Sequence, residues 1–306
     1  MAYPIAAGQT AYSGVFIPEI WSTKMIEKYY DSTMLSVISN TDYEGEIRNQ
    51  GDKVIIRTHA TLEINDYSIG QTLVNQRPIG GTIEMLIDKG FYWSAVIDDV
   101  VKKQQDIDQM NNWAMDAAEQ MKIKLDRRVL ASIYPDIAAN NKGATAGRIS
   151  GSLNLGTTGA ALAITRTNIL DTILYMGQAL DEENAPESGR WLAMPYWATT
   201  LLKLSDIKDA SLTNDGTSPL RNGRVGMIDR FTIYNSNLLP TFVDGGNNTT
   251  QFLAGTTDGM TFATQLTNTE SLRAESTFGE IMRGLMVYGH KVVKPEALVG
   301  AYVRQG

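Results

Sequence analysis

The sequence predicts an α+β protein in which strands and helices occupy separate stretches of the chain. Three observations predict this class. Strand patterns dominate residues 53–97, one long helical pattern covers residues 98–133, and shorter strands and two helices follow up to the C-terminus. With 306 residues, 43% of them hydrophobic, the chain is long enough to bury a substantial core.

The first 40 residues combine an arm with a short helix. Residues 1–14 are rich in small and turn-forming residues, and we expect them to be extended. Residues 18–30 have helical spacing, and Pro18 suits the first turn because an N–H has no intrahelical partner there. The apolar face of this helix would consist of Ile20, Trp21, Met25, Ile26 and Tyr29.

Residues 41–97 predict a ribbon of strands with a wide polar tip. The strand patterns cover residues 53–58, 61–64, 82–87 and 91–97. A two-stranded ribbon is only marginally stable in water, so it needs a surface to lie on. If its own subunit offers none, a neighbouring subunit must supply it.

The pattern over residues 98–133 predicts a helix of about 54 Å at a rise of ~1.5 Å per residue. Asp98 and Asp99 favour its beginning through the helix dipole, and each has a lysine four residues later, Lys102 and Lys103. The predicted apolar face contains Ile107, Met110, Ala114, Ala117, Ala118, Met121, Leu125 and Val129.

The remaining chain predicts a mixed domain. We expect mostly loop up to residue 163 and then helices at residues 165–180 and 195–204, the second beginning with Pro195. The expected strands cover residues 190–194, 225–234, 251–262, 282–288 and 298–303.

Motifs for catalysis or metal binding are missing from the sequence. The chain has no cysteine, and its two histidines, His59 and His290, lack a second ligand at metal spacing. Asp106 and Asp108 point in opposite directions on a helix and cannot share a cation. A net charge of −7 disfavours a nucleic-acid reader. We therefore expect no enzyme activity, cofactor or metal, and neither a signal peptide nor a membrane span.

Four short motifs stand out in the first part of the chain: Gly51-Asp52-Lys53-Val54, Ile64-Asn65-Asp66-Tyr67-Ser68-Ile69-Gly70, Leu86-Ile87-Asp88-Lys89 and Val96-Ile97-Asp98-Asp99. The C-terminal run extends from Gly284 to Val299. Together with the order of the elements, these motifs and this run resemble the Hong Kong 97-type capsid proteins of tailed phages.

The resemblance implies a subunit that forms the hexamers and pentamers of an icosahedral shell around double-stranded DNA. It implies a virion protein assembled in the host bacterial cytoplasm with a separate scaffolding protein and a portal. The implied divisions are an arm (1–40), an extended loop (41–97), a spine helix in the peripheral domain (98–139), an axial domain (140–272) and C-terminal strands returning to the peripheral domain (273–306). The residues expected to contact another subunit are Asp66, Tyr67, Ile69, Gly70, Leu73, Val74 and Pro78.

Three alternatives remain open from the sequence. A bacterial nanocompartment shell protein would share the fold but enclose cargo enzymes. An α+β enzyme could assemble a site from scattered carboxylates. A tail-tube or decoration protein is disfavoured by the long helix, because those proteins consist mainly of strands.

Overall fold

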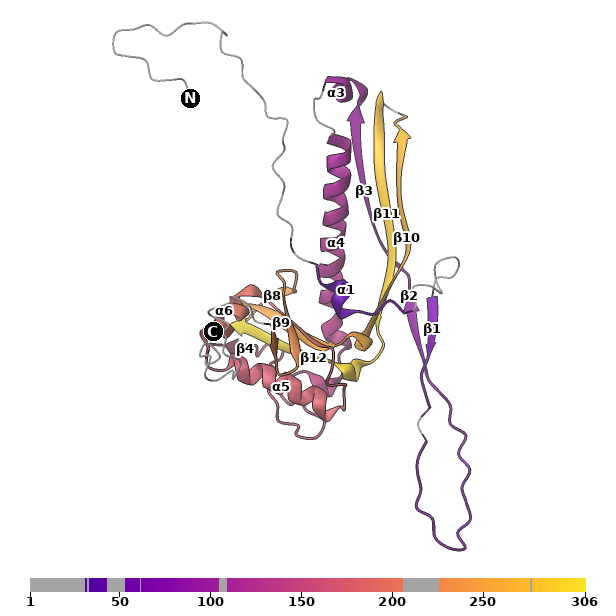
Figure 1. Ribbon diagram of the computed structural model, residues 1–306, viewed down its shortest axis with the longest axis vertical. Coiled ribbons are helices and arrows are strands. Elements are labelled where there is room, and N and C mark those ends of the chain that lie inside the picture. The colour runs from indigo at the N-terminus through magenta and orange to yellow at the C-terminus, as the bar shows by residue number, and fades with distance from the viewer. Residues whose placement is uncertain are drawn as a thin grey trace, which may run out of the picture.

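The computed structural model describes residues 31, 33–42, 53–60, 62–104, 109–205, 226–275 and 277–306. It confirms an α+β protein with a three-stranded sheet beside a long helix and a seven-stranded mixed sheet covered by shorter helices (Figure 1). The arm expected at residues 1–14 and the helix expected at residues 18–30 lie outside the described residues.

The ribbon is shorter than the sequence predicts. β1 (Lys53–Arg57) pairs antiparallel with β2 (Thr82–Leu86), and the ladder ends at the pair Arg57–Thr82. The strand expected at residues 61–64 is wrong: residues 62–64 are extended but lie beyond this ladder and have no partner strand. At the base of the ribbon, Val54 and Met85 are buried against Ala263, so the ribbon does find a surface within its own subunit.

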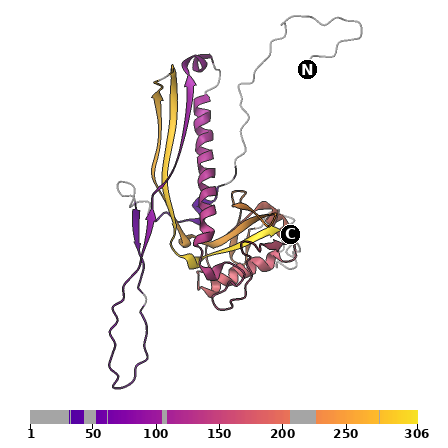
Figure 2. The ribbon, with the colours of Figure 1, turned by 180° about the vertical axis from the view of Figure 1, so that it is seen from behind.

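The third strand of this region does not return along the ribbon. β3 (Lys89–Asp98) instead pairs antiparallel with β11 (Gly279–Val292), which pairs in turn with β10 (Met260–Arg273). Phe91 and Ile97 lie on one face of β3 and are both buried. The sheet runs beside the long helix in both views (Figures 1 and 2), and burial of this apolar face explains why β3 leaves the ribbon.

The expected helix at 98–133 is described as α3 (Asp99–Gln104) and α4 (Gln109–Asp136), and residues 105–108 are outside the described ranges. Charged side chains of α3 form ion pairs with residues of the sheet and not with residues farther along the helix. Asp99 pairs with Arg273 on β10, and Lys102 pairs with Glu280 on β11. The predicted ion pairs at four-residue spacing are therefore replaced by ion pairs that connect α3 to the strands.

The second sheet has the strand order β4-β12-β9-β5-β7-β6, and β8 pairs with β9 outside this path. Pairs β12–β4 and β5–β7 are parallel and the others are antiparallel. The strands are β4 (Leu162–Ile164), β5 (Arg190–Met194), β6 (Met227–Ile228), β7 (Phe231–Asn235), β8 (Thr241–Asp244), β9 (Asn247–Thr256) and β12 (Leu298–Gln305).

Helices α5 (Ile169–Glu182) and α6 (Tyr196–Leu204) bury their apolar faces against this sheet. α5 begins four residues later than predicted because the Asn168 side chain accepts the N–H of Thr165 at 2.7 Å and turns the chain first. Pro195 precedes α6 as its N-cap instead of occupying its first turn. The short helix α1 (Leu35–Ile38) and three 3₁₀ turns complete the described elements. The turns are η1 (Ala139–Asn141), η3 (Thr257–Gly259) and η4 (Pro295–Ala297).

A shared apolar core joins the two sheets. It combines Val129 and Leu130 of α4 with Trp191 of β5, Leu253 of β9 and Met260 at the beginning of β10. The strand expected at 251–262 is divided by η3, after which β10 enters the three-stranded sheet. The range 140–272 thus spans strands of both sheets, and β11 and β12 in the range 273–306 also lie in different sheets.

Candidate assembly interface

The loop between β1 and β2, residues 62–81, is here named the tip loop. It projects from the Arg57–Thr82 end of the ribbon as two extended segments, away from α4 and the three-stranded sheet (Figure 1). Where the tip loop meets the ribbon, the N–H of Thr58 donates to the carbonyl oxygen of Gly81 at 2.9 Å. A Cβ on Gly80 would lie 2.5 Å from the carbonyl oxygen of Thr58, so only glycine permits this close approach.

Farther along the tip loop, one side chain connects the two segments. The amide of Gln76 accepts the N–H of Glu63 at 3.1 Å and donates to its carbonyl oxygen at 2.9 Å. At the end, the N–H of Gln71 donates to the carbonyl oxygen of Ser68 at 3.0 Å across a turn in which Gly70 has a φ of +86°. This positive φ explains the glycine, because it is unfavourable for other residues.

Seven large apolar side chains on the tip loop are exposed within the subunit. Ile69 is 99% exposed and Val74 is 81% exposed. The full set is Leu62, Ile64, Tyr67, Ile69, Leu73, Val74 and Ile79. Isolated exposed apolar residues are ordinary, but seven of them within one loop of residues 62–81 indicate an interaction surface.

All seven sequence-predicted contact residues lie on the tip loop and are exposed. The structure brings Tyr67, Ile69 and Gly70 together around the turn, while Pro78 lies on the returning segment near Gly80. Sequence reasoning omitted Leu62, Ile64 and Ile79, which are equally exposed apolar residues. The alternation of Leu62 with Ile64 was a signal for the first two, whereas Ile79, between Pro78 and Gly80, has no such pattern.

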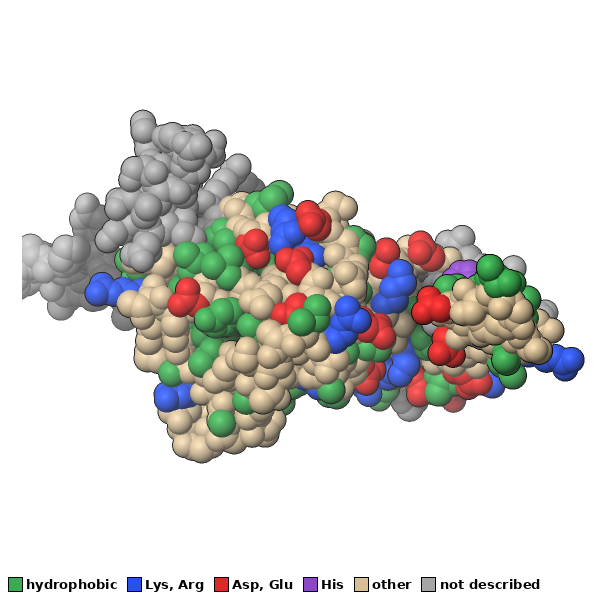
Figure 3. All heavy atoms as spheres, turned by 90° about the horizontal axis from the view of Figure 1, so that it is seen from below, with side chains coloured by type: hydrophobic (Ala, Val, Ile, Leu, Met, Phe, Trp, Pro, Cys, Tyr) green, Lys and Arg blue, Asp and Glu red, His purple; other side chains and the backbone are tan. Residues whose placement is uncertain are grey.

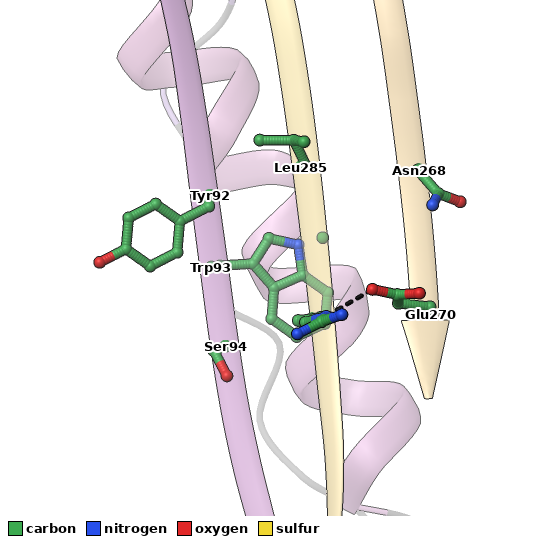
Figure 4. A pocket seen from close by; sticks show the side chains of 8 residues that line it. Tyr92, Trp93, Ser94, Asn268, Glu270 and Leu285 are labelled. Carbon is green, nitrogen blue, oxygen red and sulfur yellow. Dashed lines mark hydrogen bonds and ion pairs between the residues drawn. The ribbon is translucent and has the colours of Figure 1, made fainter. Parts of the chain in front are cut away.

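A hollow of about 440 Å³ lies on the three-stranded sheet (Figure 4). It is lined from three strands, and an ion pair between Arg283 and Glu270 forms one wall. Trp93 is the direct cross-strand partner of Gly284, and a Cβ on residue 284 would lie 2.2 Å from its Nε1. Because Gly284 has no side chain, the indole of Trp93 can lie against this position. The lining residues are Tyr92, Trp93, Ser94, Asn268, Glu270, Arg283, Gly284 and Leu285.

Two acidic side chains at the end of α5 are held by ion pairs and hydrogen bonds. Asp181 binds Arg190 and Arg230, each at 2.7 Å, and these hydrogen bonds outweigh desolvation and lower the pKa of its carboxyl. Glu182 accepts the N–H groups of Ile149 and Ser150, and these bonds lower its pKa to about 2. Asp181 therefore connects the end of α5 to β5 and to the turn before β7, and Glu182 connects it to residues 149–150.

Asp126 is buried and His290 is partly buried, and sequence reasoning singled out only the histidine. Asp126 on α4 is 2% exposed and accepts the N–H groups of Met34 and Leu35. Burial raises the pKa of its carboxyl, and the two hydrogen bonds oppose that shift. His290 on β11 contacts Ser132 on α4, and burial lowers the pKa of its imidazole to about 4.

Acidic and basic side chains are interspersed on the face seen from below, and neither sign forms a continuous field there (Figure 3). Among the described residues, no group of three or more His, Asp or Glu side chains has the arrangement of a metal site. None of the described helices combines the length and apolar character needed to cross a membrane.

The family model described as phage capsid protein matches residues 85–301. Solved structures of phage capsid proteins match nearly the whole chain. "Mycobacterium phage Che8" matches with a TM-score of 0.76 at 24% identity, covering 93% of this chain and 96% of that one. "Capsid structure of the Cyanophage P-SCSP1u" has a TM-score of 0.74 at 14% identity, covering 95% and 94% of the two chains.

A third structure, "Cyanophage Pam1 capsid asymmetric unit", matches with a TM-score of 0.73 at 12% identity and covers 97% of this chain and 99% of that one. No curated protein matches the chain. The fold is therefore the Hong Kong 97-type fold of tailed-phage capsids. The chain belongs to the phage capsid protein family and is a major capsid protein.

Membership of this family places the protein in the virion capsid as a homo-oligomeric shell subunit. The family is a structural class without enzymatic activity. The comparisons do not favour the alternatives of a nanocompartment shell protein or an α+β enzyme.

Proposed function

We propose that the chain builds the hexamers and pentamers of an icosahedral shell that encloses double-stranded DNA, and that the tip loop binds an adjacent subunit. The observation that carries this proposal is the exposed apolar set on the tip loop. Burying a large apolar side chain contributes about 1.5–3 kcal/mol, so the set supplies a driving force that only a second molecule can use. The binding surface is proposed to include Asp66, Tyr67, Ile69, Gly70, Leu73, Val74 and Pro78.

We further propose the division into an arm, an extended loop, a peripheral domain with the spine helix α4, an axial domain and returning C-terminal strands, over the ranges given above. The pairing of β10 with β11 supports one adjustment, in which residues 260–272 are part of the proposed peripheral domain. Assembly in the host cytoplasm with a separate scaffolding protein and a portal completes the proposal.

The proposal is tested by removing residues 66–81 and replacing them with a two-glycine linker. Wild-type protein, expressed with its scaffolding protein, should give closed shells by negative-stain electron microscopy. The deletion should give soluble subunits and no regular shells. Normal shells from the deletion would overturn the proposed role of the tip loop.

A second variant keeps the length of the tip loop. Changing Ile69, Leu73 and Val74 to serine removes apolar surface and should also abolish shells. The matched control changes Asn65, Thr72 and Asn75 to serine in the same loop, leaves the apolar set intact and should assemble normally.

A further inference from the structure

One side of α4 gathers positive charge in a chain that is negative overall. Lys124, Arg127 and Arg128 are all exposed, although the whole chain has a net charge of −7. At about 100° of rotation per residue, these three side chains share one side of the helix. Leu125 and Val129 lie on the opposite side and are buried in the shared core. The three cations are here named the α4 basic patch.

The acidic side chains nearest to the α4 basic patch along the helix are engaged elsewhere. Asp126 is buried and binds backbone N–H groups just before and within α1. Glu119 pairs with Lys122, and Asp136 pairs with Lys291. Within the part of the chain that the structure describes, no ion pair involves the α4 basic patch. Its positive charge is therefore not neutralised by neighbouring carboxylates.

Two of the three cations lie against an aromatic ring. Lys124 Nζ lies 4.9 Å from the centroid of the Phe91 ring, and Cζ of Arg128 lies 5.5 Å from it. An aromatic ring attracts a cation without removing its charge. Both side chains are thus oriented by β3 and still carry a full charge that a partner can bind.

A cluster of exposed Lys and Arg side chains without carboxylates fits a polyanion. Such side chains neutralise the phosphates of a nucleic-acid backbone, and these contacts do not depend on base sequence. The negative charge on the rest of the chain repels the same polyanion. Contact is therefore limited to the α4 basic patch, and the affinity is low and sensitive to salt.

We infer that the α4 basic patch contacts the phosphate backbone of the DNA that the shell encloses. The exposed side of α4 then forms part of the inner surface of the shell. This assignment rests on the proposed function, in which the shell encloses double-stranded DNA, and it names the surface of the subunit that meets the DNA.

Fluorescence anisotropy of a short labelled DNA duplex of mixed sequence, titrated with full-length unassembled subunits, measures this contact. Three phosphate contacts predict a slope of about −2.7 for the logarithm of the binding constant against the logarithm of the salt concentration. The wild type should therefore bind about 40-fold more weakly at about 200 mM salt than at about 50 mM.

The test variant combines Lys124→Gln, Arg127→Gln and Arg128→Gln. At the lower salt concentration it should bind more than about tenfold more weakly than the wild type, and its salt dependence should be nearly flat. A second variant, Lys124→Arg with Arg127→Lys and Arg128→Lys, keeps the charge and should bind like the wild type. This second variant separates the effect of charge from any effect of the contacts with Phe91.

The matched control removes the same types of charge at three exposed ion pairs. It combines Lys122→Gln, Arg148→Gln and Arg283→Gln, so its net charge equals that of the test variant. Because each of these cations already has an acidic partner, the control should keep the slope of the wild type.

Crosslinking tests the contact inside the assembled particle. In DNA-filled particles, formaldehyde should crosslink DNA to Lys124 and not to Lys53, an exposed lysine on the ribbon that pairs with Glu84. Crosslinks at Lys53 without any at Lys124 would overturn the assignment. So would a wild type that does not bind the duplex, or a test variant with the affinity and slope of the wild type. Failure of the proposed function looks different, because the wild type would then form no DNA-filled shells.

Discussion

At the scale of single residues, the contact between Ser132 and His290 fixes the tautomer of a partly buried imidazole. Ser132 donates its hydroxyl proton to the carbonyl oxygen of Val129 at 2.7 Å. Its oxygen then accepts a hydrogen bond from Nε2–H of His290 at 2.6 Å, which leaves Nδ1 as the unprotonated nitrogen. Burial is the main cause of the lowered pKa, and Lys89 adds to it, while Asp136 opposes it.

This contact predicts an acid-sensitive contribution to stability. The folded pKa of His290, about 4, is below the usual value of 6.5, so the unfolded state binds a proton first as pH falls. The contribution is complete above pH 6.5 and is lost between about pH 6.5 and 4, at up to about 1.4 kcal/mol per pH unit. The check is the free energy of unfolding of the wild type against pH, compared with His290→Gln, which should lack this slope.

The control variant is His59→Gln. It changes the other histidine of the chain, an exposed residue, and should keep the acid slope. If the free energy of unfolding depended on pH in the same way in the wild type and in His290→Gln, the imidazole of His290 would not be the source of the acid sensitivity.

At the scale of elements, α1 (Leu35–Ile38) depends on tertiary contacts because a four-residue helix cannot sustain itself in water. Asp126 Oδ2 lies 2.6 Å from the nitrogen of Met34 and 3.2 Å from that of Leu35, and Leu35 and Ile38 are buried in the shared core. Beyond α1, Asn40 forms a parallel bridge with Thr261 at the beginning of β10. Residues 33–40 therefore connect α4 to the beginning of β10.

Changing Asp126 to alanine should destabilise the subunit by about 2–4 kcal/mol, because two buried N–H groups lose their acceptor. Asp126→Asn retains an acceptor oxygen and should lose less. Chemical denaturation measures both changes, and hydrogen exchange at Leu35–Ile38 should accelerate in the alanine variant. Glu119→Ala, at an exposed ion pair on the same helix, is the control. A loss below about 0.5 kcal/mol for Asp126→Ala, the range of ordinary surface changes, would contradict this account.

At the scale of the whole molecule, folding and assembly use different parts of the chain. The two sheets share one core around Val129, Trp191 and Met260. The base of the ribbon has a small core of its own with Ala263, whereas the tip loop contributes no buried side chain within the subunit. The subunit can therefore fold before the tip loop finds its partner surface.

This separation predicts that deleting residues 66–81 leaves the folded subunit as stable as the wild type, within about 1 kcal/mol, since exposed residues contribute little. Calorimetry or chemical denaturation of unassembled subunits checks this expectation. The full-length variant with serine at Ile69, Leu73 and Val74 is the comparison for any effect of loop length. A drop of several kcal/mol in both variants would mean that the tip loop supports the fold itself.

Local patterns were sufficient for several elements. Strand patterns over residues 53–58 and 82–87 predicted β1 and β2, and the apolar spacing through Leu125 and Val129 predicted the long helix. The polar, glycine-containing tip predicted an exposed loop, because such residues cannot form a core. These features depend on neighbours within a few residues, which the sequence displays directly.

The sequence by itself determined the α+β class, the long helix and the exposed tip loop with most of its apolar residues. Only the tertiary structure decided that β3 pairs with β11, that Asp126 holds Met34, and that Tyr92 and Arg283 border one hollow. In each case the partners lie more than 90 positions apart along the chain. Which distant segments meet depends on the burial of whole faces and not on local periodicity, and for that reason these contacts could not be predicted from the order of residues.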